Sequence, residues 1–184
     1  MIDFLNLVNQ RQSVRNYSPQ KIEEEKISRC IEAARLAPSA CNAQPWKFII
    51  IDAPELKLKV AEASESKVLG FNKFTRHCPI IIAVVRESPN ITSKLGAIIK
   101  DKPYPIMDVG ISVSHFCLQA TAEGLGTCIL GWFNEKRIKK LLNIPKNKRL
   151  DLLISVGYAA DEKAIPKQRK TTEQMSSRNT YKQL

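Results

Sequence analysis

The sequence predicts one domain, residues 1–184, that mixes α-helices with short β-strands and belongs to the α/β or α+β class. Apolar residues recur at helical spacing around 22–34 and 108–123, whereas KFIIID at 47–52 and PIIIAVV at 79–85 have the length and composition of buried strands. Hydrophobic residues make up 43% of the chain and charged residues 26%, so it can bury an ordinary core.

Two helices are predicted before the first strand. The first carries Phe4, Leu5 and Val8, with Asp3 as a cap, and ends near Arg11. The second starts after Ser18 and Pro19 and stops before Pro38. Its apolar face consists of Ile22, Ile27, Cys30, Ile31 and Ala34.

The elements after the first strand alternate in type. A helix at 54–64 has Pro54 in its first turn, where proline is tolerated. We expect the proline-bearing connection at 86–107 to be the most mobile region. The remaining predictions are a helix at 108–123 closed by Gly124, a strand at 127–130, a short helix capped by Asn134 and a strand at 150–158.

Composition argues against several classes of protein. No apolar run is long enough to cross a bilayer, and the N-terminus has no signal-peptide pattern, so we expect a cytoplasmic protein without membrane contact. Five cysteines without a C-x-x-C pair predict reduced thiols. The net charge of +11 is compatible with nucleic acid, an anionic surface or phosphorylated ligands, but the basic residues are spread along the chain without a nucleic-acid-binding motif.

Some segments resemble common catalytic or cofactor-binding motifs but lack the spacing or the flanking elements that those motifs require. GLGTCILG at 124–131 follows a helix and precedes a strand, the reverse of a dinucleotide-binding loop. GISVS at 110–114 is not a nucleophile elbow. Asp108 and His115 could share a helix face, yet residues of this kind usually pack or lie at the surface. Two histidines without an acidic or cysteine cluster predict no metal site.

Two basic segments remain as candidates for binding chemistry. In RQSVR, Arg11, Ser13 and Arg15 alternate, so an extended backbone would point two guanidinium groups and a hydroxyl to one side, a suitable cradle for a phosphate. PKQRK at 166–170 repeats this geometry with Lys167 and Arg169. The alternatives are a solvated basic loop and a disordered terminus.

Taken together, these motifs resemble the nitroreductase family of flavin mononucleotide (FMN) flavoproteins, in order along nearly the whole chain. The resemblance rests on RQSVR, on APSACNAQPW at 37–46, on GLGTCILGWF at 124–133 and on the closing PKQR. It implies an α+β fold with a mixed, mainly antiparallel sheet flanked by helices, in an intertwined homodimer. It also implies a C-terminal extension, 159–184, that contributes to the FMN site.

The resemblance assigns a role to each candidate residue. Arg11 and Ser13 would hold the ribityl phosphate together with Lys167 and Arg169. Arg15 would approach the pyrimidine edge of the flavin and raise its two-electron potential. The remaining assignments are Asn72 at the same edge, the backbone of Leu130 and Gly131 facing N5, and Pro38, Ser39 and Asn42 reaching the flavin from the partner subunit.

The implied activity is reduction of FMN by NADH or NADPH, followed by reduction of a nitroaromatic, quinone or other electron-poor acceptor. The protein would supply placement and electrostatics, so no nucleophile or metal is expected. Three departures leave details open. The 86–107 connection is shorter than the insertion of some relatives, Leu130 replaces an acidic residue found in others, and either Lys73 or Thr75 could lie at the flavin.

Other functions are consistent with parts of the sequence. A flavin carrier or sensor without turnover would need the same basic segments. A specialised family member, such as a dehalogenase or a biosynthetic flavoenzyme, would share the motifs as well. Nucleic-acid binding is a further alternative, but it would not explain the polar segment APSACNAQPW. The donor nucleotide, the physiological acceptor, the reactivity with oxygen and the role of Cys41 are not indicated.

Overall fold

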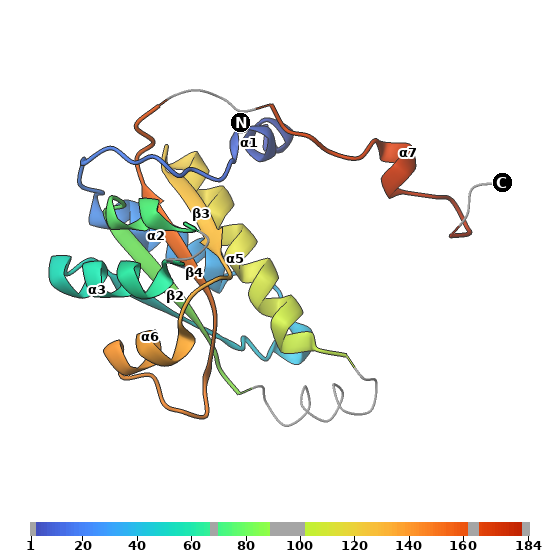
Figure 1. The fold of residues 1–184 in the computed structure, drawn as a ribbon. Coiled ribbons are helices and arrows are strands. Elements are labelled where there is room, and N and C mark those ends of the chain that lie inside the picture. The colour runs from blue at the N-terminus through green and yellow to red at the C-terminus, as the bar shows by residue number, and fades with distance from the viewer. Residues whose placement is uncertain (1–2, 67–69, 89–101, 162–165, 182–184) are drawn as a thin grey trace.

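The computed structural model describes residues 3–66, 70–88, 102–161 and 166–181. Its centre is an antiparallel sheet of four strands in the order β1-β2-β4-β3 (Figure 1). The strands are β1 (Trp46–Ile51), β2 (Ile80–Arg86), β3 (Gly126–Leu130) and β4 (Arg149–Gly157). The predicted α+β class, with an antiparallel sheet flanked by helices, is therefore confirmed.

Helices cover both faces of the sheet. They are α1 (Phe4–Gln10), α2 (Glu24–Arg35), α3 (Pro54–Ser64), α5 (Tyr104–Ala122), α6 (Glu135–Leu141) and α7 (Thr172–Met175). Two short 3₁₀ turns cover Ala40–Asn42 and Lys73–Arg76. No helix in the described part of the chain is both long and apolar enough to cross a membrane.

Strand β2 is buried on both faces and divides the core in two. Ile81 and Ala83 pack with residues of α3 and α6, such as Val60. Ile82 points the other way and packs with residues of α2 and α5, because successive side chains of a strand alternate between faces. The continuous apolar run that predicted this strand thus reflects burial between two helical layers.

Most predicted boundaries agree with the structure, including Pro54–Ser64 for α3 and the left-handed Gly124 after α5. Two helix starts were predicted wrongly. Helix α2 begins only at Glu24, and the Ser18 amide instead donates to the Tyr158 carbonyl at 2.9 Å. Helix α5 begins at Tyr104 and not at 108, because Pro105 is tolerated in its first turn. Strand β1 lies at an edge, so Ile50 is 44% exposed although a buried strand was predicted. The mobility predicted for the 86–107 connection falls largely on 89–101, which lie outside the described residues.

The segment after α1 adds itself to the sheet at the edge formed by β3. Ser13 forms a parallel bridge with Thr127, and the amide of Val14 donates to the Thr127 carbonyl at 2.9 Å. The Tyr17 hydroxyl is buried, 2.7 Å from Oγ of Ser155, and its burial raises the pKa of the phenol. Residues 13–17 are therefore fixed along the ends of β3 and β4.

Two glycines make this close approach possible. Gly126 of β3 pairs with Gly157 of β4. A Cβ on Gly126 would lie 2.5 Å from Cγ2 of Val14, and a Cβ on Gly157 would lie 2.7 Å from Cδ1 of Tyr17. Since both distances are shorter than van der Waals contact allows, a larger residue at either position would displace the segment that carries Arg15.

We predict that Gly126→Ala lowers the free energy of unfolding by about 1–3 kcal/mol, the usual cost of overpacking, because the new methyl group collides with Val14. Thermal unfolding of the purified variant measures this. Gly131→Ala is the control, since nothing lies within 4 Å of a Cβ there. Equal melting temperatures for the two variants would contradict the steric argument.

Candidate cofactor site

The two basic segments predicted from opposite ends of the chain line one pocket of about 400 Å³. Arg11, Ser13 and Arg15 come from the extended segment that runs beside β3, and their alternation brings them to the same pocket. Lys167 and Arg169 come from the tail. Gln12, Pro166 and Gln168 complete the lining. We refer to this pocket as the cradle.

Lys167 fastens the tail to the end of α1. Its Nζ donates to the carbonyl oxygen of Val8 at 2.6 Å and also to that of Asn9. Carbonyl groups in the last turn of a helix lack intrahelical partners and carry the negative end of the helix dipole, so an ammonium group is favoured there. The contact explains why the tail meets residues 159 positions earlier in the chain.

The cradle concentrates positive charge. Four cationic side chains line it, and none of its described lining residues is acidic. Desolvation and the neighbouring charges of Arg11 and Arg169 lower the pKa of Lys167. An anion with several oxygen atoms would offset this repulsion, and Arg and Ser supply the hydrogen-bond donors that a phosphate accepts.

Polar groups also gather at the other end of β3, where Leu130 and Gly131 lead into Trp132. The Asn72 side chain donates to the carbonyl oxygens of Ser64 at 3.0 Å and Trp132 at 2.9 Å, so both amide hydrogens are used within the protein. Its side-chain oxygen remains as an acceptor. Leu130 is buried, while Gly131 is exposed.

The contacts around Asn72 also distinguish Lys73 from Thr75, either of which was predicted to lie at the flavin. Thr75 is fully buried, and its hydroxyl donates to the Asn72 carbonyl at 2.7 Å. Lys73 is exposed. Of the two side chains, only that of Lys73 is therefore accessible to a ligand.

The loop at 37–45 has a strained backbone. Cys41, Asn42 and Gln44 adopt φ angles of 52°, 51° and 46°, a region that costs energy for residues other than glycine. The loop is held by its own contacts: Oγ of Ser39 accepts from the Gln44 amide at 3.0 Å, and Nε2 of Gln44 donates to Oδ1 of Asn42 at 3.0 Å. Pro38 and Asn42 are exposed, and Ser39 is half-buried.

Asp108 anchors this loop from α5. Its buried carboxylate accepts from the Ala40 amide at 3.2 Å. Nδ1 of His115 lies 3.3 Å from the carbonyl oxygen of Ala33 instead. The two residues thus contact different backbone groups, and the sequence did not reveal that Asp108 supports the loop.

Within one chain, the loop at 37–45 and the cradle do not meet. The loop contacts Asp108 in the second turn of α5, whereas Gln12 lines a small pocket together with Thr121, near the opposite end of that helix. At 1.5 Å per residue these two positions are roughly 20 Å apart. The loop also leads into β1, across the whole sheet from β3. Ser39 and Asn42 are therefore far from the cradle of their own chain.

Comparison with known proteins places the chain in a family. Residues 8–158 match the model of the Nitroreductase family. The chain belongs to the nitroreductase family. The fold and the resemblance predicted from the sequence are both confirmed, and because nitroreductases are FMN-dependent oxidoreductases, so are the enzyme class and the cofactor.

The individual relatives of this nitroreductase have varied names. An Archaeoglobus fulgidus protein named "Putative NADH dehydrogenase/NAD(P)H nitroreductase" is 32% identical, over 89% of both chains. The iodotyrosine deiodinase of Thermotoga neapolitana is 28% identical, over 86% of this chain and 89% of its own. The crystal structure of a nitroreductase family protein from Clostridium novyi NT has a TM-score of 0.75 at 31% identity, over 90% of this chain and 89% of its own.

We predict that Asp108→Ala frees the 37–45 loop of this nitroreductase. Loss of a charge-assisted hydrogen bond, worth about 1.5–3 kcal/mol, should speed hydrogen exchange at the Ala40 amide by roughly tenfold or more. Hydrogen–deuterium exchange with mass spectrometry measures this. Asp108→Asn, which keeps a carbonyl acceptor, should stay close to the wild type. Unchanged exchange in the alanine variant would show that Asp108 does not hold the loop.

Proposed function

We propose that this protein is an NAD(P)H-dependent oxidoreductase that reduces nitroaromatic, quinone or related electron-poor acceptors in a ping-pong cycle. The cradle is the observation that carries the proposal, because four cationic side chains without an acidic neighbour suit the phosphate of FMN. The family match and the name of the Archaeoglobus relative support the pyridine-nucleotide donor. We further infer that the chain works as one cytoplasmic domain.

Each residue near β3 has a distinct part in this proposal. Arg11, Ser13, Lys167 and Arg169 bind the phosphate, so the 159–184 extension contributes to the site. FMN, when bound, supplies hydride transfer at N5. Arg15 also lines the cradle and provides positive charge toward the pyrimidine edge.

The far end of β3 receives the ring system. A β-strand rises about 3.4 Å per residue, so the step from Ser13, beside Thr127, to Gly131 is on the order of 13 Å. That span suits a flavin with its phosphate at one end and its ring at the other. The backbone at Leu130 and Gly131 faces N5, Oδ1 of Asn72 accepts from the pyrimidine edge, and Lys73 is the accessible cation nearby.

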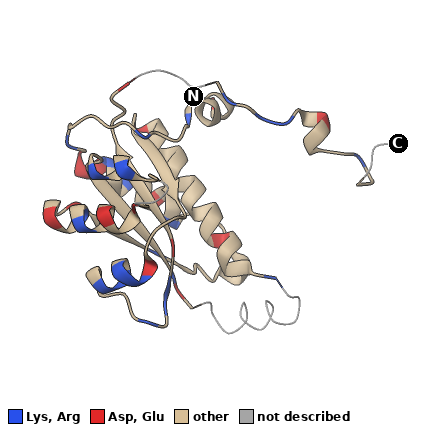
Figure 2. Ribbon diagram, in the orientation of Figure 1, with Lys and Arg blue, Asp and Glu red and all other residues tan. Residues whose placement is uncertain are grey.

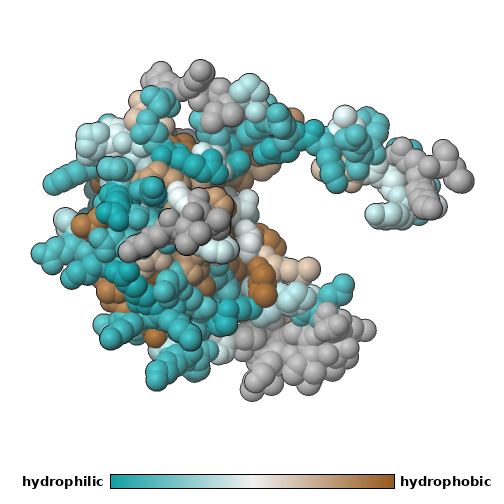
Figure 3. Space-filling view, in the orientation of Figure 1, coloured by the Kyte–Doolittle hydropathy of each residue, from teal (hydrophilic) through white to brown (hydrophobic). Residues whose placement is uncertain are grey.

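A second copy of the chain completes the site in this proposal. Hydrophobic side chains remain exposed over α5, where Ile106 is 52% and Met107 53% exposed (Figure 3). Phe4 and Leu5 of α1 are more exposed still, at 61% and 75%. Exposed apolar surface of this kind indicates a partner. In a homodimer, Pro38, Ser39 and Asn42 of one subunit would reach the flavin of the other, which their distance from their own cradle requires.

Dehalogenation is the second candidate function. The similarity to the Thermotoga iodotyrosine deiodinase extends over most of both chains. The same cradle would serve that reaction, and only the acceptor would differ. Comparing reoxidation by iodotyrosine with reoxidation by menadione separates the two functions.

Stopped-flow spectroscopy tests the activity. We expect NADH or NADPH to bleach the flavin absorption of the purified protein and menadione or nitrofurazone to restore it. Arg11→Gln combined with Arg169→Gln should weaken FMN binding by roughly a hundredfold, because two charge-assisted hydrogen bonds are lost. Lys21→Gln with Lys59→Gln removes the same charge elsewhere and should retain FMN. Bound FMN that neither nucleotide reduces would indicate a carrier or sensor instead.

Oligomeric state tests the shared site. Met107→Glu with Ile111→Glu places charge on the exposed face of α5 and should yield monomers that bind FMN poorly. Analytical ultracentrifugation with detection at the flavin wavelength measures both properties. Monomers that keep their flavin would show that the partner's loop does not contribute. Leu58→Glu, at an exposed position on α3, is the control.

A further inference from the structure

A second concentration of positive charge lies away from the cradle. Residues 134–149 contain seven lysines and arginines and a single acidic residue, Glu135, so this stretch carries +6 of the chain's net +11. The even spread of charge predicted from the sequence does not hold here. Figure 2 shows these basic residues on α6 and on the connection from α6 to β4.

The local structure folds this connection back over α6. Helix α6 ends at Leu141, and Asn143 beyond it has a φ of 53°. The amide of Ile144 donates to the carbonyl oxygen of Lys139 at 2.9 Å. This is the hydrogen-bond pattern of a Schellman turn. At the other end, the carboxylate of Glu135 accepts from the Leu150 amide at 3.1 Å and pairs with Arg149 at 3.3 Å. Both ends of the connection are therefore fixed to α6.

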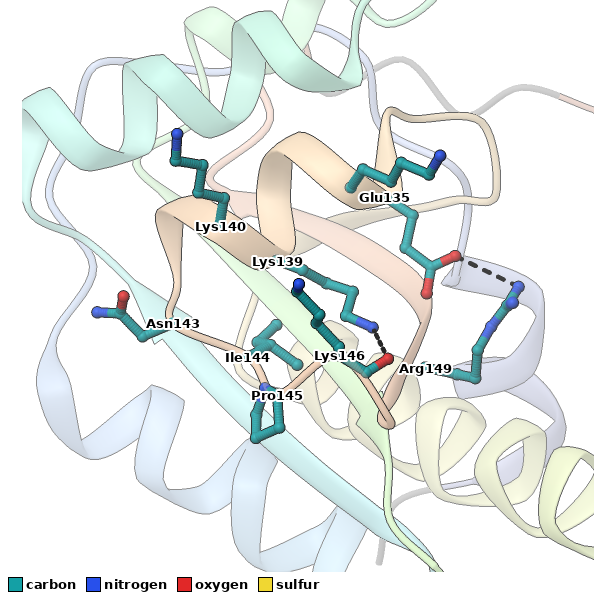
Figure 4. Close-up of a pocket in the computed structure, with 9 residues that line it drawn as sticks. Glu135, Lys139, Lys140, Asn143, Ile144, Pro145, Lys146 and Arg149 are labelled. Carbon is teal, nitrogen blue, oxygen red and sulfur yellow. Dashed lines mark hydrogen bonds and ion pairs between the residues drawn. The ribbon is translucent and has the colours of Figure 1, made fainter.

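A pocket of about 910 Å³ lies between α6 and this connection (Figure 4). Its volume is in the range of sites for organic ligands. Ile144 and Pro145 give it an apolar part, and cationic side chains from α6 and the connection contribute to the rest of the lining. The lining residues are Glu135, Lys136, Lys139, Lys140, Asn143, Ile144, Pro145, Lys146 and Arg149. We refer to it as the lysine pocket.

Some of these cations have structural roles. The Nζ of Lys139 donates to the carbonyl oxygen of Lys146 at 2.9 Å and to that of Lys148, so it holds the connection in place. Arg149 is paired with Glu135, which is the pocket's one acidic residue. These contacts hold the pocket in shape. They do not explain why further lysines line it.

Three exposed lysines remain, namely Lys136, Lys140 and Lys146. Within the described residues, none of their three ammonium groups donates a hydrogen bond or forms an ion pair. The helix dipole favours Lys140 in the last turn of α6, but it disfavours Lys136 in the first turn and does not act on Lys146, which lies beyond the helix. Like charges gathered around one cavity repel one another, and a bound anion would remove that repulsion.

We propose that the lysine pocket binds a phosphorylated organic molecule at a site separate from the cradle. Lys136, Lys140 and Lys146 would hold its phosphate groups, and Ile144 and Pro145 would contact its organic part. The combination of several ammonium groups with an apolar wall favours such a ligand over inorganic phosphate alone. This proposal does not depend on the flavin activity, because no residue is shared between the two pockets.

Isothermal titration calorimetry of the FMN-loaded protein at physiological salt tests the proposal with ATP as the probe. Loading with FMN fills the cradle first. We expect saturable binding of ATP, competition by pyrophosphate and no binding of adenosine. Lys136→Gln, Lys140→Gln and Lys146→Gln together should weaken ATP binding by roughly tenfold or more, since three ion pairs are lost.

A matched control variant separates the effect of the three pocket lysines from the effect of a lower net charge. Lys21→Gln, Lys47→Gln and Lys59→Gln together remove three exposed lysines from other surfaces, so the net charge of this variant equals that of the pocket variant. It should bind ATP like the wild type. The proposal is overturned by absence of ATP binding, by failure of pyrophosphate to compete, or by equal losses in the two variants. Preferential binding of an RNA oligonucleotide, weakened equally in both, would identify a nucleic-acid surface instead.

Discussion

The extended segment at 13–17, packed against the ends of β3 and β4, is the constraint on which the rest of the site depends. Backbone hydrogen bonds from Val14 to Thr127 and from Ala160 to Asn16 set its register, and the buried hydroxyl of Tyr17 fixes its other end. The paired glycines of β3 and β4 let it lie close enough to continue the sheet. Because the segment is held in this way, its alternating side chains reach one pocket.

The tail depends on the same arrangement. It meets the N-terminal segment because Lys167 binds the last carbonyl groups of α1, which a helix end leaves without partners. The result is a cluster of cations that repel one another, and a bound anion would offset this repulsion. Under the proposed function, the phosphate of FMN would offset the repulsion among the cations that the two chain ends bring to the cradle.

Local sequence signals predicted most of the fold. Pro54 marks the start of α3, and the buried runs of β2 and β4 were evident because a strand between two helical layers is apolar throughout. The late start of α2 was missed because the contact of Ser18 with Tyr158 is tertiary. The four-residue helix α7 was missed as well, since it is too short for periodicity to reveal it.

The candidate site was predictable in its residues but not in its assembly. Alternation along RQSVR indicated a one-sided cluster, whereas the meeting of this cluster with Lys167 depends on contacts 159 residues apart. The anchoring of the strained loop by Asp108 was hidden for the same reason. The lysine pocket requires the chain reversal after α6, which a single left-handed residue, Asn143, produces.

The central claim is that both ends of the chain bind one phosphate group. Comparing the affinities of the apoprotein for FMN and for riboflavin tests it most directly, because the two flavins differ only in that phosphate. The account predicts that FMN binds at least about a hundredfold more tightly, in line with several charge-assisted hydrogen bonds, and that high salt narrows the difference. Equal affinities for the two flavins would contradict it.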